Sequence, residues 1–377
     1  MNNTLPPKHP DSQTDRLLGT LTATVVMVTI TGNLMSMTAI YRSLSRRKTV
    51  SKSLRKPHLL LIFCLSFLDF CIGTFHASFV SVACFMGRWL DMKEVELDEE
   101  AYPQQILNEG TWCNVSSFII RPLLCMAIGT VAVIALERTV TISSPLRAER
   151  VLTNSRTLLL LAVFWLISLL LLVQEMYFPH VTVYILPAFQ CIPSYTNTRD
   201  VTQIISTNTS YNFFNFVIIT ASSAYTVLTI IKLRDREKKL SLNRRSRGSA
   251  CSKTRQGAYN SKRILLSITI LLLISVNTGT WLPQNILSSL RYVLPANSSL
   301  ANSLQDINLR VIVWWLQYMS SAVNPVIYAL RLRVMREEIR IVWQMVLRKI
   351  RYIDLLDSAV TWTSFMDKTS FNPLGRI

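Results

Sequence analysis

The sequence is poor in charged residues, and acidic residues are the scarcest of them. Only 16% of its 377 residues are charged, with 22 Asp and Glu against 40 Lys and Arg, for a formal charge of +18. Half of the residues are hydrophobic, which argues against a large soluble domain. The basic residues lie in the gaps between long apolar runs. This pattern is typical of cytoplasmic loops rather than of a nucleic-acid-binding protein, so we expect no nucleic-acid partner.

The sequence also lacks the short motifs that carry enzyme and metal chemistry. It has no Cys-x-x-Cys spacing or zinc pattern, no His-Glu-x-x-His, no Gly-x-Ser-x-Gly and no cluster of intramembrane histidines. We therefore expect no enzyme and no metal site. No internal repeat or inverted symmetry is visible, which weighs against a transporter. Residues 1–10 lack the pattern of a cleavable signal peptide, so the first apolar helix is expected to act as its own anchor.

Seven apolar segments have the length of a transmembrane helix. At about 1.5 Å rise per residue, each crosses a hydrocarbon core of about 30 Å. The segments run over about residues 17–41, 57–87, 113–141, 154–177, 210–233, 261–292 and 307–330. The sequence therefore predicts an all-α membrane protein, a seven-transmembrane helix bundle. The predicted organisation is an extracellular tail (1–16), the bundle (17–331), an amphipathic helix (332–349) and a cytoplasmic tail (350–377).

The distribution of basic residues predicts the orientation. Three gaps, at 42–56, 143–156 and 232–263, are rich in Lys and Arg and lie on one side of the membrane. Because basic loops stay in the cytoplasm, we expect an extracellular N-terminus and a cytoplasmic C-terminus at the plasma membrane. After the last span, apolar residues recur at helical spacing among arginines, from Met335 to Val346. This predicts a short eighth helix lying on the inner leaflet.

The predicted outer side carries an acidic loop and glycosylation motifs. The loop from Arg88 to Gly110 holds seven acidic residues against two basic ones. We interpret it as a solvated surface, and steering of a cationic ligand is the alternative. Asn2, Asn208 and Asn297 each begin an Asn-x-Ser/Thr acceptor, and Asn208 is expected in the loop before the fifth span.

The cysteines fall into two groups. Four lie inside apolar runs and are expected to be buried thiols: Cys64, Cys71, Cys84 and Cys125. Cys113 and Cys191 lie in polar loops or at a helix end, where they can pair outside the cell.

Charged residues at membrane depth are candidate functional groups. Asp69 lies in the second span, where a lone carboxylate costs several kcal/mol unless it faces the bundle interior. The Glu137-Arg138 pair ends the third span, either as a snorkelling pair at the interface or as a conformational switch. One interpretation of Asp69 is a carboxylate on the ion path of a transporter or ion channel. His76 is expected to be a hydrogen-bonded interior histidine, with no assigned function.

Taken together, these residues resemble the rhodopsin-like (class A) family of G-protein-coupled receptors. The resemblance covers about Leu17 to Arg348, with one motif per span in the family's order. The motifs are Gly32-Asn33, Leu65 to Asp69, Cys113, Glu137-Arg138-Thr139, Trp165, Tyr225, Trp281-Leu282-Pro283 and Asn324-Pro325-Val326-Ile327-Tyr328.

The resemblance implies a mechanism and a set of site residues. An extracellular ligand would enter between the spans, the sixth helix would swing outward about Pro283, and a heterotrimeric G protein would bind inside. The coupling switch would comprise Glu137, Arg138, Thr139, Tyr225, Asn324, Pro325 and Tyr328. The ligand pocket and its floor would include Ile120, Arg121, Trp281, Pro283, Gln317 and Tyr318. The resemblance further implies a Cys113–Cys191 disulfide. It implies no cofactor other than an allosteric sodium ion, bound at Asp69, Ser320, Ser321 and Asn324. Arrestin, receptor kinases and membrane lipids are implied as further partners.

Several positions depart from the family pattern. Val217 replaces the usual proline of the fifth span, Ala127 the serine of the sodium site, and Asn277 the phenylalanine one turn before Trp281. Arg263 stands where some members carry a glutamate that pairs with the arginine corresponding to Arg138. We expect the repulsion between these two arginines, and the loss of the aromatic ring, to favour the open state and to give basal signalling.

The ligand class is narrowed by two absences. Ile120 replaces the aspartate of amine receptors, and residues 314–318 contain no lysine for the Schiff base of opsins. A peptide or an anionic or lipid small molecule is therefore favoured over an amine or retinal. Arg121 pairs with Glu175 or another acid in the simplest interpretation, and holds a ligand carboxylate in the functional one.

Overall fold

The computed structural model describes the helices and strands of the chain and leaves most of the connecting segments outside the description. The described residues are 12–46, 57–86, 94–96, 105–108, 111–144, 148, 150–177, 180–185, 190–195, 198–246, 255–293, 307–331, 335–348 and 351. The predicted glycosylation sites Asn2 and Asn297, and the tail from residue 352, lie outside these residues.

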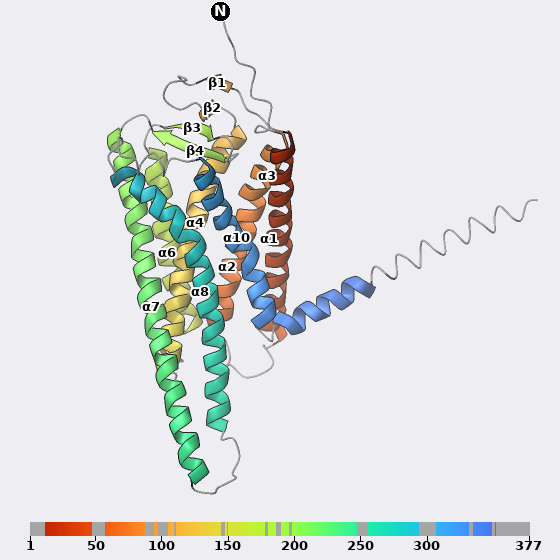
Figure 1. Ribbon diagram of the computed structural model, residues 1–377, viewed down its shortest axis with the longest axis vertical. Helices are drawn as coiled ribbons and strands as arrows, with labels where there is room; N and C mark the ends of the chain where they lie inside the picture. Colours follow the sequence, from red (N-terminus) through yellow and green to blue (C-terminus); the bar gives the residue numbers. More distant parts are fainter. Residues whose placement is uncertain are drawn as a thin grey trace, which may run out of the picture.

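Long helices form a bundle whose axes run roughly along the long axis of the molecule (Figure 1). The second span is a composite of α2, a π-helical turn and α3. The elements are α1 (Ser12–Arg46), α2 (Pro57–Ile72), η3 (Gly73–Ala77), α3 (Ser78–Met86), α4 (Thr111–Ser143), α6 (Asn154–Tyr177), α7 (Thr198–Ser246), α8 (Arg255–Val293) and α10 (Ile307–Arg331). The predicted seven-helix bundle is therefore confirmed. Six predicted spans each lie inside one helix, and the second covers α2, η3 and α3 together.

Six of the helical segments in the described part of the chain are long and apolar enough to cross a membrane. The seventh, α10, is more polar because it carries Gln317, Ser320, Ser321 and Asn324, and the last three of these are buried. Its buried polar residues face the bundle interior rather than lipid. Composition alone therefore underestimates how well this helix is suited to cross a membrane. Large apolar side chains on the other helices, such as Leu159 and Phe213, are exposed on the outer face of the bundle.

A small antiparallel sheet covers the end of the bundle at which α1 begins (Figure 1). It has the order β1 (Glu94–Glu96), β2 (Gln105–Asn108), β3 (His180–Ile185) and β4 (Gln190–Tyr195). Strands β3 and β4 form a hairpin, and β2 extends it through the pairing of Gln105 with Ile185. The acidic segment predicted as a solvated loop thus contributes two strands to this sheet.

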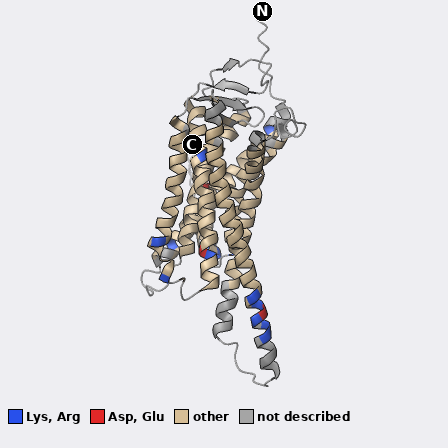
Figure 2. Cartoon of the chain, turned by 90° about the vertical axis from the view of Figure 1, so that its left-hand side faces the viewer, with Lys and Arg blue, Asp and Glu red and all other residues tan. Residues whose placement is uncertain are grey.

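Helix α7 is longer than the predicted fifth span at both ends. It begins at Thr198 and ends at Ser246, where the sequence predicted a span from about Ser210 to Leu233. The prediction that Asn208 lies in a loop is wrong, because it lies inside α7 with a half-buried side chain. At the other end α7 projects beyond the bundle, and described Lys and Arg residues gather on this extension (Figure 2).

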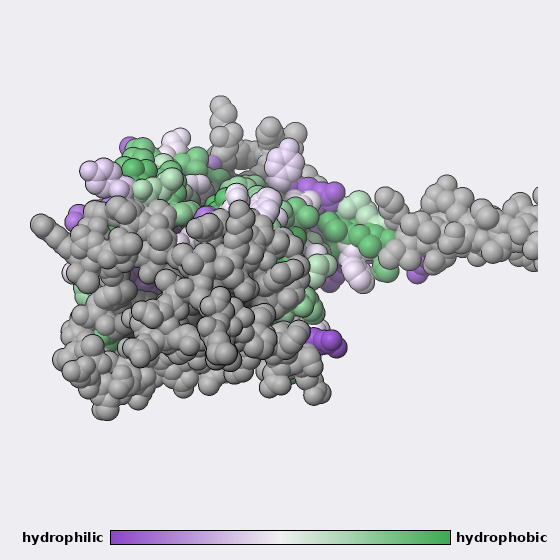
Figure 3. Space-filling model, turned by 90° about the horizontal axis from the view of Figure 1, so that it is seen from above, coloured by the Kyte–Doolittle hydropathy of each residue, from purple (hydrophilic) through white to green (hydrophobic). Residues whose placement is uncertain are grey.

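A further helix follows α10 over residues 335–348 and corresponds to the predicted amphipathic helix. Figure 3, seen from above, shows that this segment projects sideways from the bundle. Met335 is fully buried at its start, whereas Arg336 and Trp343 are exposed. The helix is thus anchored at its start and runs outward from the half of the bundle opposite the sheet (Figure 1).

One contact explains why three helices meet closely in the core. The hydroxyl of Tyr211 on α7 donates to the carbonyl oxygen of Phe164 at 3.2 Å and lies 3.1 Å from the hydroxyl of Ser168, both on α6. On α4, a Cβ atom at Gly129 would lie only 2.9 Å from this hydroxyl. Glycine therefore lets α4 approach the α6–α7 pair. Beside it, Trp165 donates its indole N–H to Thr130 of α4 at 3.1 Å.

Candidate functional site

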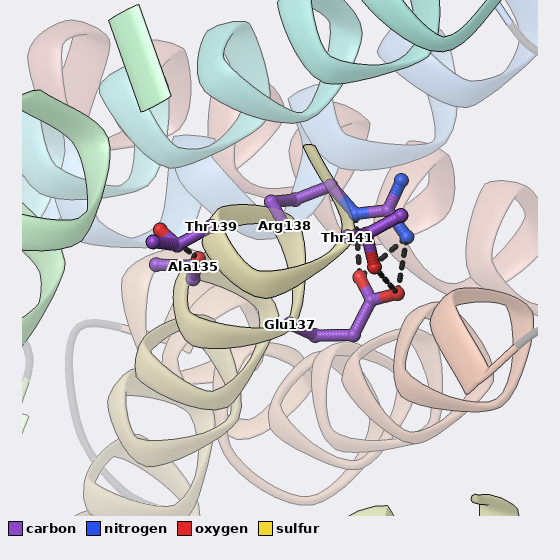
Figure 4. A network of polar contacts seen from close by, with 5 residues as sticks. All are labelled: Ala135, Glu137, Arg138, Thr139 and Thr141. Atoms are coloured by element: carbon purple, nitrogen blue, oxygen red, sulfur yellow. Dashed lines mark hydrogen bonds and ion pairs between the residues drawn. The ribbon is translucent and has the colours of Figure 1, made fainter. Parts of the chain in front are cut away.

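The predicted switch lies at the end of α4 farthest from the sheet. Arg138 donates from Nε and Nη2 to the two carboxylate oxygens of Glu137, each at 2.5 Å, and both side chains are only 3% exposed. Thr141 donates to the same carboxylate at 3.1 Å (Figure 4). A buried, bidentate ion pair is not the snorkelling pair of the simpler interpretation, because snorkelling charges reach water. The pair satisfies two charges that would be costly to bury separately.

Thr139 lies on the other side of the same helix (Figure 4). Its hydroxyl is 2.9 Å from the carbonyl oxygen of Ser222 and 3.1 Å from the hydroxyl of Thr226, both on α7. The Glu137-Arg138-Thr139 motif therefore restrains Arg138 on one side and joins α4 to α7 on the other. Tyr225, the predicted switch residue of α7, is 52% exposed.

Asp69 is the centre of a buried hydrogen-bond network between α2, α8 and α10. Its carboxylate accepts hydrogen bonds from the Ser321 hydroxyl at 2.7 Å and from the Asn324 amide at 2.8 Å. Asn277 of α8 donates to the side-chain oxygen of Asn324 at 3.0 Å. The carboxylate is 1% exposed and thus faces the bundle interior, as a membrane-buried acid must.

The Gly32-Asn33 motif of α1 contacts α10 around Pro325. Proline has no N–H, so the carbonyl oxygen of Ser321, four residues earlier, loses its normal helical donor. The Asn33 amide donates to this oxygen at 3.0 Å and replaces the missing bond. A Cβ atom at Gly32 would lie 2.9 Å from the Pro325 ring, so glycine allows α1 to approach closely enough.

Trp281 connects α8 to α10 one layer nearer the sheet. Its indole N–H donates to the hydroxyl of Ser320 at 2.9 Å, and this hydroxyl donates in turn to the carbonyl oxygen of Gln317 at 2.7 Å. Ser320, predicted as part of the sodium site, is therefore turned toward Trp281 instead of Asp69. Ile120 and Tyr318, two further pocket predictions, pack in one apolar cluster.

A cavity of about 10 Å³ lies beside the Asn277 side chain. It is lined by Ile128, Val131, Phe216, Ile219, Asn277, Thr278 and Trp281. This volume holds about one water molecule. The structure thus places Asn277, which departs from the family pattern, and Ile128 at one cavity below Trp281.

The fit of a sodium ion can be judged from the residues around Asp69. Both carboxylate oxygens already accept hydrogen bonds, Ser320 is turned away, and Ala127 offers no hydroxyl. In the described part of the chain no three His, Cys, Asp or Glu side chains form a group that could hold a metal ion. The predicted sodium ligands are therefore only partly assembled.

His76 is a buried, hydrogen-bonded interior histidine, as the sequence predicted, but its partners were not predicted. Its Nδ1 lies 2.8 Å from the hydroxyl of Ser116 on α4, and its Nε2 lies 2.6 Å from the hydroxyl of Tyr318 on α10. The π-helical turn η3 adds a residue to the helix at this position, as π-turns at functional sites often do. The His76 side chain is 2% exposed and joins three helices. A histidine within the second span was the visible signal, but the sequence gives no indication of its two partners.

The structure describes some of the remaining predicted residues and leaves the side chains of others outside the description. Cys113 at the start of α4 and Cys191 of β4 form a disulfide, which ties the sheet to the bundle and confirms that prediction. Tyr328 is buried at 1% exposure. Pro283 lies inside α8 and is half-buried. Arg121 of α4 is also half-buried. The side chains of Arg263 and Glu175 lie outside the described residues, so the repulsion between Arg263 and Arg138 and the pairing of Arg121 with Glu175 stay predictions.

Residues 32–328 match the family described as 7 transmembrane receptor (rhodopsin family). The chain belongs to this family. The crystal structure of squid rhodopsin is similar in fold, with a TM-score of 0.66, 19% sequence identity and 92% of each chain covered. A search of curated protein sequences found no match.

Membership of this family defines the chain as a rhodopsin-like receptor with a G-protein-coupled receptor role, in a family of receptors rather than enzymes. Together with the apolar helices, it identifies a multi-pass membrane protein.

Proposed function

We propose that this receptor transmits binding of an extracellular ligand to a heterotrimeric G protein by outward movement of α8. The observation that carries the proposal is the buried Glu137–Arg138 pair, which holds an arginine away from water at the end of α4. Release of Arg138 would free a cation for a protein partner at that end. Such a two-state arrangement needs a ligand with different affinities for the two states.

Hydrogen bonds between α8 and α10 would couple ligand binding to the Arg138 end of the bundle. Trp281 bonds to Ser320 in one layer, and Asn277 bonds to Asn324 in the next. Outward movement of α8 about Pro283 breaks or rearranges these bonds first. Only a few kcal/mol of differential ligand binding are needed to shift such an equilibrium, typically about 1–3 kcal/mol.

The favoured ligand is a peptide or an anionic or lipid small molecule. In the described segment of α10 there is no lysine that could form a Schiff base, and Ile120 offers no charge to an amine. Arg121 lies one residue further along α4 and is half-buried. We propose that it faces an acidic ligand group, so Arg121→Ala should reduce responses to acidic ligands in a screen while surface expression stays near that of the parent.

The test is G-protein dissociation in cells, read out with a panel of G-protein α-subunits and normalised to surface expression. The parent receptor should respond without an identified ligand or to hits from a ligand library, and Arg138→Ala should abolish every response. Leu159→Ala, on the lipid-facing surface of α6, is the matched control and should retain them. A receptor whose Arg138→Ala variant signals like the parent would not couple through this site.

The proposed setting is the plasma membrane, with the N-terminus outside and the C-terminus in the cytoplasm. Arrestin and receptor kinases are proposed as further cytoplasmic partners. The orientation rests on the basic residues that gather toward the end of the bundle opposite the sheet (Figure 2). An N-terminal epitope tag should stain intact cells, whereas a C-terminal tag should stain only permeabilised cells. Staining of the C-terminal tag on intact cells would reverse the topology.

A further inference from the structure

Thr139 differs from its two neighbours in the motif because its contacts reach a second helix. The ion-pair network of Glu137, Arg138 and Thr141 lies entirely within α4. The Thr139 hydroxyl instead lies 2.9 Å from the carbonyl oxygen of Ser222 on α7. The ion pair therefore keeps a cation away from water, whereas Thr139 restrains the position of a neighbouring helix.

The hydroxyl protons at this contact can be assigned from the chemistry of the partners. The carbonyl oxygens of Ala135, at 3.0 Å, and of Ser222 can only accept hydrogen bonds from Thr139. The single proton of Thr139 is therefore donated to these oxygens. The Thr226 hydroxyl, 3.1 Å from the Thr139 hydroxyl, is then the donor of the second contact between the helices. Thr139 thus makes two hydrogen bonds to α7, one as donor and one as acceptor.

These two hydrogen bonds fix how α7 is rotated about its own axis. Ser222 and Thr226 are four residues apart on one face of α7, and they are 7% and 1% exposed. One turn further along, Ile142 of α4 and Ile230 of α7 belong to one apolar cluster. Apolar contacts are non-directional and tolerate a turn of the helix, whereas hydrogen bonds depend on angle. The rotational position of α7 therefore depends on Thr139.

We propose that Thr139 is a positioning residue that holds α7 in this rotational position through its hydrogen bonds to Ser222 and Thr226. The inference rests on the proposed function, because it makes Thr139 one of the restraints that ligand binding overcomes. Loss of the two bonds leaves α7 helical but free to turn. The open state then costs less, while the pair of Glu137 and Arg138 stays intact.

Tyr225 is a suitable probe of this turn because it directly precedes Thr226. Successive side chains project about 100° apart around a helix. Tyr225 is 52% exposed, whereas Thr226 is 1% exposed. Because burial of an exposed ring is favourable, we expect a released α7 to turn Tyr225 toward the bundle. The turn then moves a residue of the predicted switch.

The proposal is tested by ¹⁹F NMR of the purified full-length receptor in nanodiscs, without ligand or G protein. The receptor carries 3-fluorotyrosine at residue 225, and doxyl-labelled lipids should broaden the parent resonance. Thr139→Val keeps the side-chain shape but removes the hydroxyl. It should raise the share of a second, less broadened resonance about two- to tenfold, as expected for lost hydrogen bonds. Thr139→Ser should restore the parent spectrum. A Thr139→Val spectrum identical to that of the parent would overturn the proposal.

Further variants separate the hydrogen bonds from a general loss of packing. Thr226→Val removes one of the two bonds and should have a smaller effect than Thr139→Val. The double variant should match Thr139→Val, because the Thr226 hydroxyl then has no bond to Thr139 left to lose. Thr220→Val, at an exposed threonine of α7, is the matched control and should leave the spectrum unchanged. Additive effects in the double variant, or equal effects of Thr139→Ser and Thr139→Val, would assign the change to packing and overturn the proposal.

Signalling in cells separates this inference from the proposed function. Thr139→Val should raise basal G-protein dissociation per surface receptor about two- to tenfold, in line with the spectral change. A spectral change with unchanged signalling would support the positioning role and contradict the proposed coupling. A rise in signalling without a spectral change would support the coupling and overturn the positioning role.

Discussion

Asn277 of α8 donates a 3.0 Å hydrogen bond to the side chain of Asn324 on α10, and Asn324 donates in turn to Asp69 of α2. Three helices are thereby joined by one buried polar chain. The sequence predicted that Asn277, in place of an aromatic ring, would weaken the packing that holds the sixth helix. A cavity of about 10 Å³ does adjoin Asn277, but the amide also supplies a bond that phenylalanine could not make.

Asn277→Ala should therefore destabilise the receptor and raise its basal signalling. The substitution removes a donor from the buried Asn324 oxygen and enlarges an existing cavity. Loss of one buried partner costs about 1–3 kcal/mol. Thermal unfolding in detergent and basal G-protein dissociation would measure the two effects. Ser275→Ala, two residues away with an exposed side chain bonded only within α8, should change neither quantity. An Asn277→Ala variant with parental basal signalling would show that this bond does not restrain α8.

Asn33 and Pro325 should show strong energetic coupling. Asn33→Ala leaves the Ser321 carbonyl oxygen without its donor and should reduce the free energy of unfolding by about 1–3 kcal/mol. Pro325→Ala restores a backbone N–H that can bond to the same oxygen. In the double variant, the Asn33 substitution should therefore cost much less than it does alone. A double-mutant cycle of thermal stabilities measures this coupling, and additive effects would contradict the compensation.

The Cys113–Cys191 disulfide should dominate the stability of the sheet end of the bundle. It closes a sequence separation of 78 residues and links α4 to β4. Cys113→Ser, Cys191→Ser and the double variant should each lose about 2–5 kcal/mol of stability, with the double variant no worse than either single one. Surface expression and thermal unfolding under non-reducing conditions would report the loss. Cys64→Ser is the matched control, because Cys64 is a free, half-buried cysteine.

Sodium should have little effect on this receptor. Ser321 and Asn324 already donate to both oxygens of Asp69, while Ser320 is bonded to Trp281 and Gln317. Exchange of sodium chloride for choline chloride at constant ionic strength should leave the unfolding temperature unchanged in the parent. A sodium-dependent rise that disappears in Asp69→Asn would show that the network opens to admit the ion.

The fold could be predicted from the sequence because membrane helices are specified locally. Every backbone polar group must be paired within its own helix, so apolar length and basic gaps located all seven spans. The predicted bounds of the fourth span agree with those of α6 (Asn154–Tyr177), since polar or basic residues mark both of its ends. Helix α7 was not, because its polar continuations on both sides are helical without being apolar.

The site could be predicted only where a motif marks it. Glu137, Arg138 and Asp69 stood out because charge is rare at membrane depth, and the structure places them in buried networks. The partners of His76 and Tyr211 depend on which faces of distant helices meet, and a single sequence carries no signal for that. The pairing of β2 with β3 was missed for the same reason, because these strands are separated by two membrane helices.

The last prediction concerns the switch itself. Glu137 is the only acidic partner of Arg138 among the described residues, and both side chains are 3% exposed. Glu137→Gln leaves the arginine cation in a buried position with a neutral neighbour, and breaking a buried pair in this way costs about 3–5 kcal/mol. Opening of the bundle relieves this cost because it returns Arg138 to water or to a protein partner. Basal signalling, measured by G-protein dissociation per surface receptor, should therefore rise in Glu137→Gln. Arg263→Glu should lower it by replacing the predicted repulsion with an attraction, and Arg156→Glu, on the exposed start of α6, is the matched charge control. If neither Glu137→Gln nor Arg263→Glu changes basal signalling, the closed state is held elsewhere in the bundle.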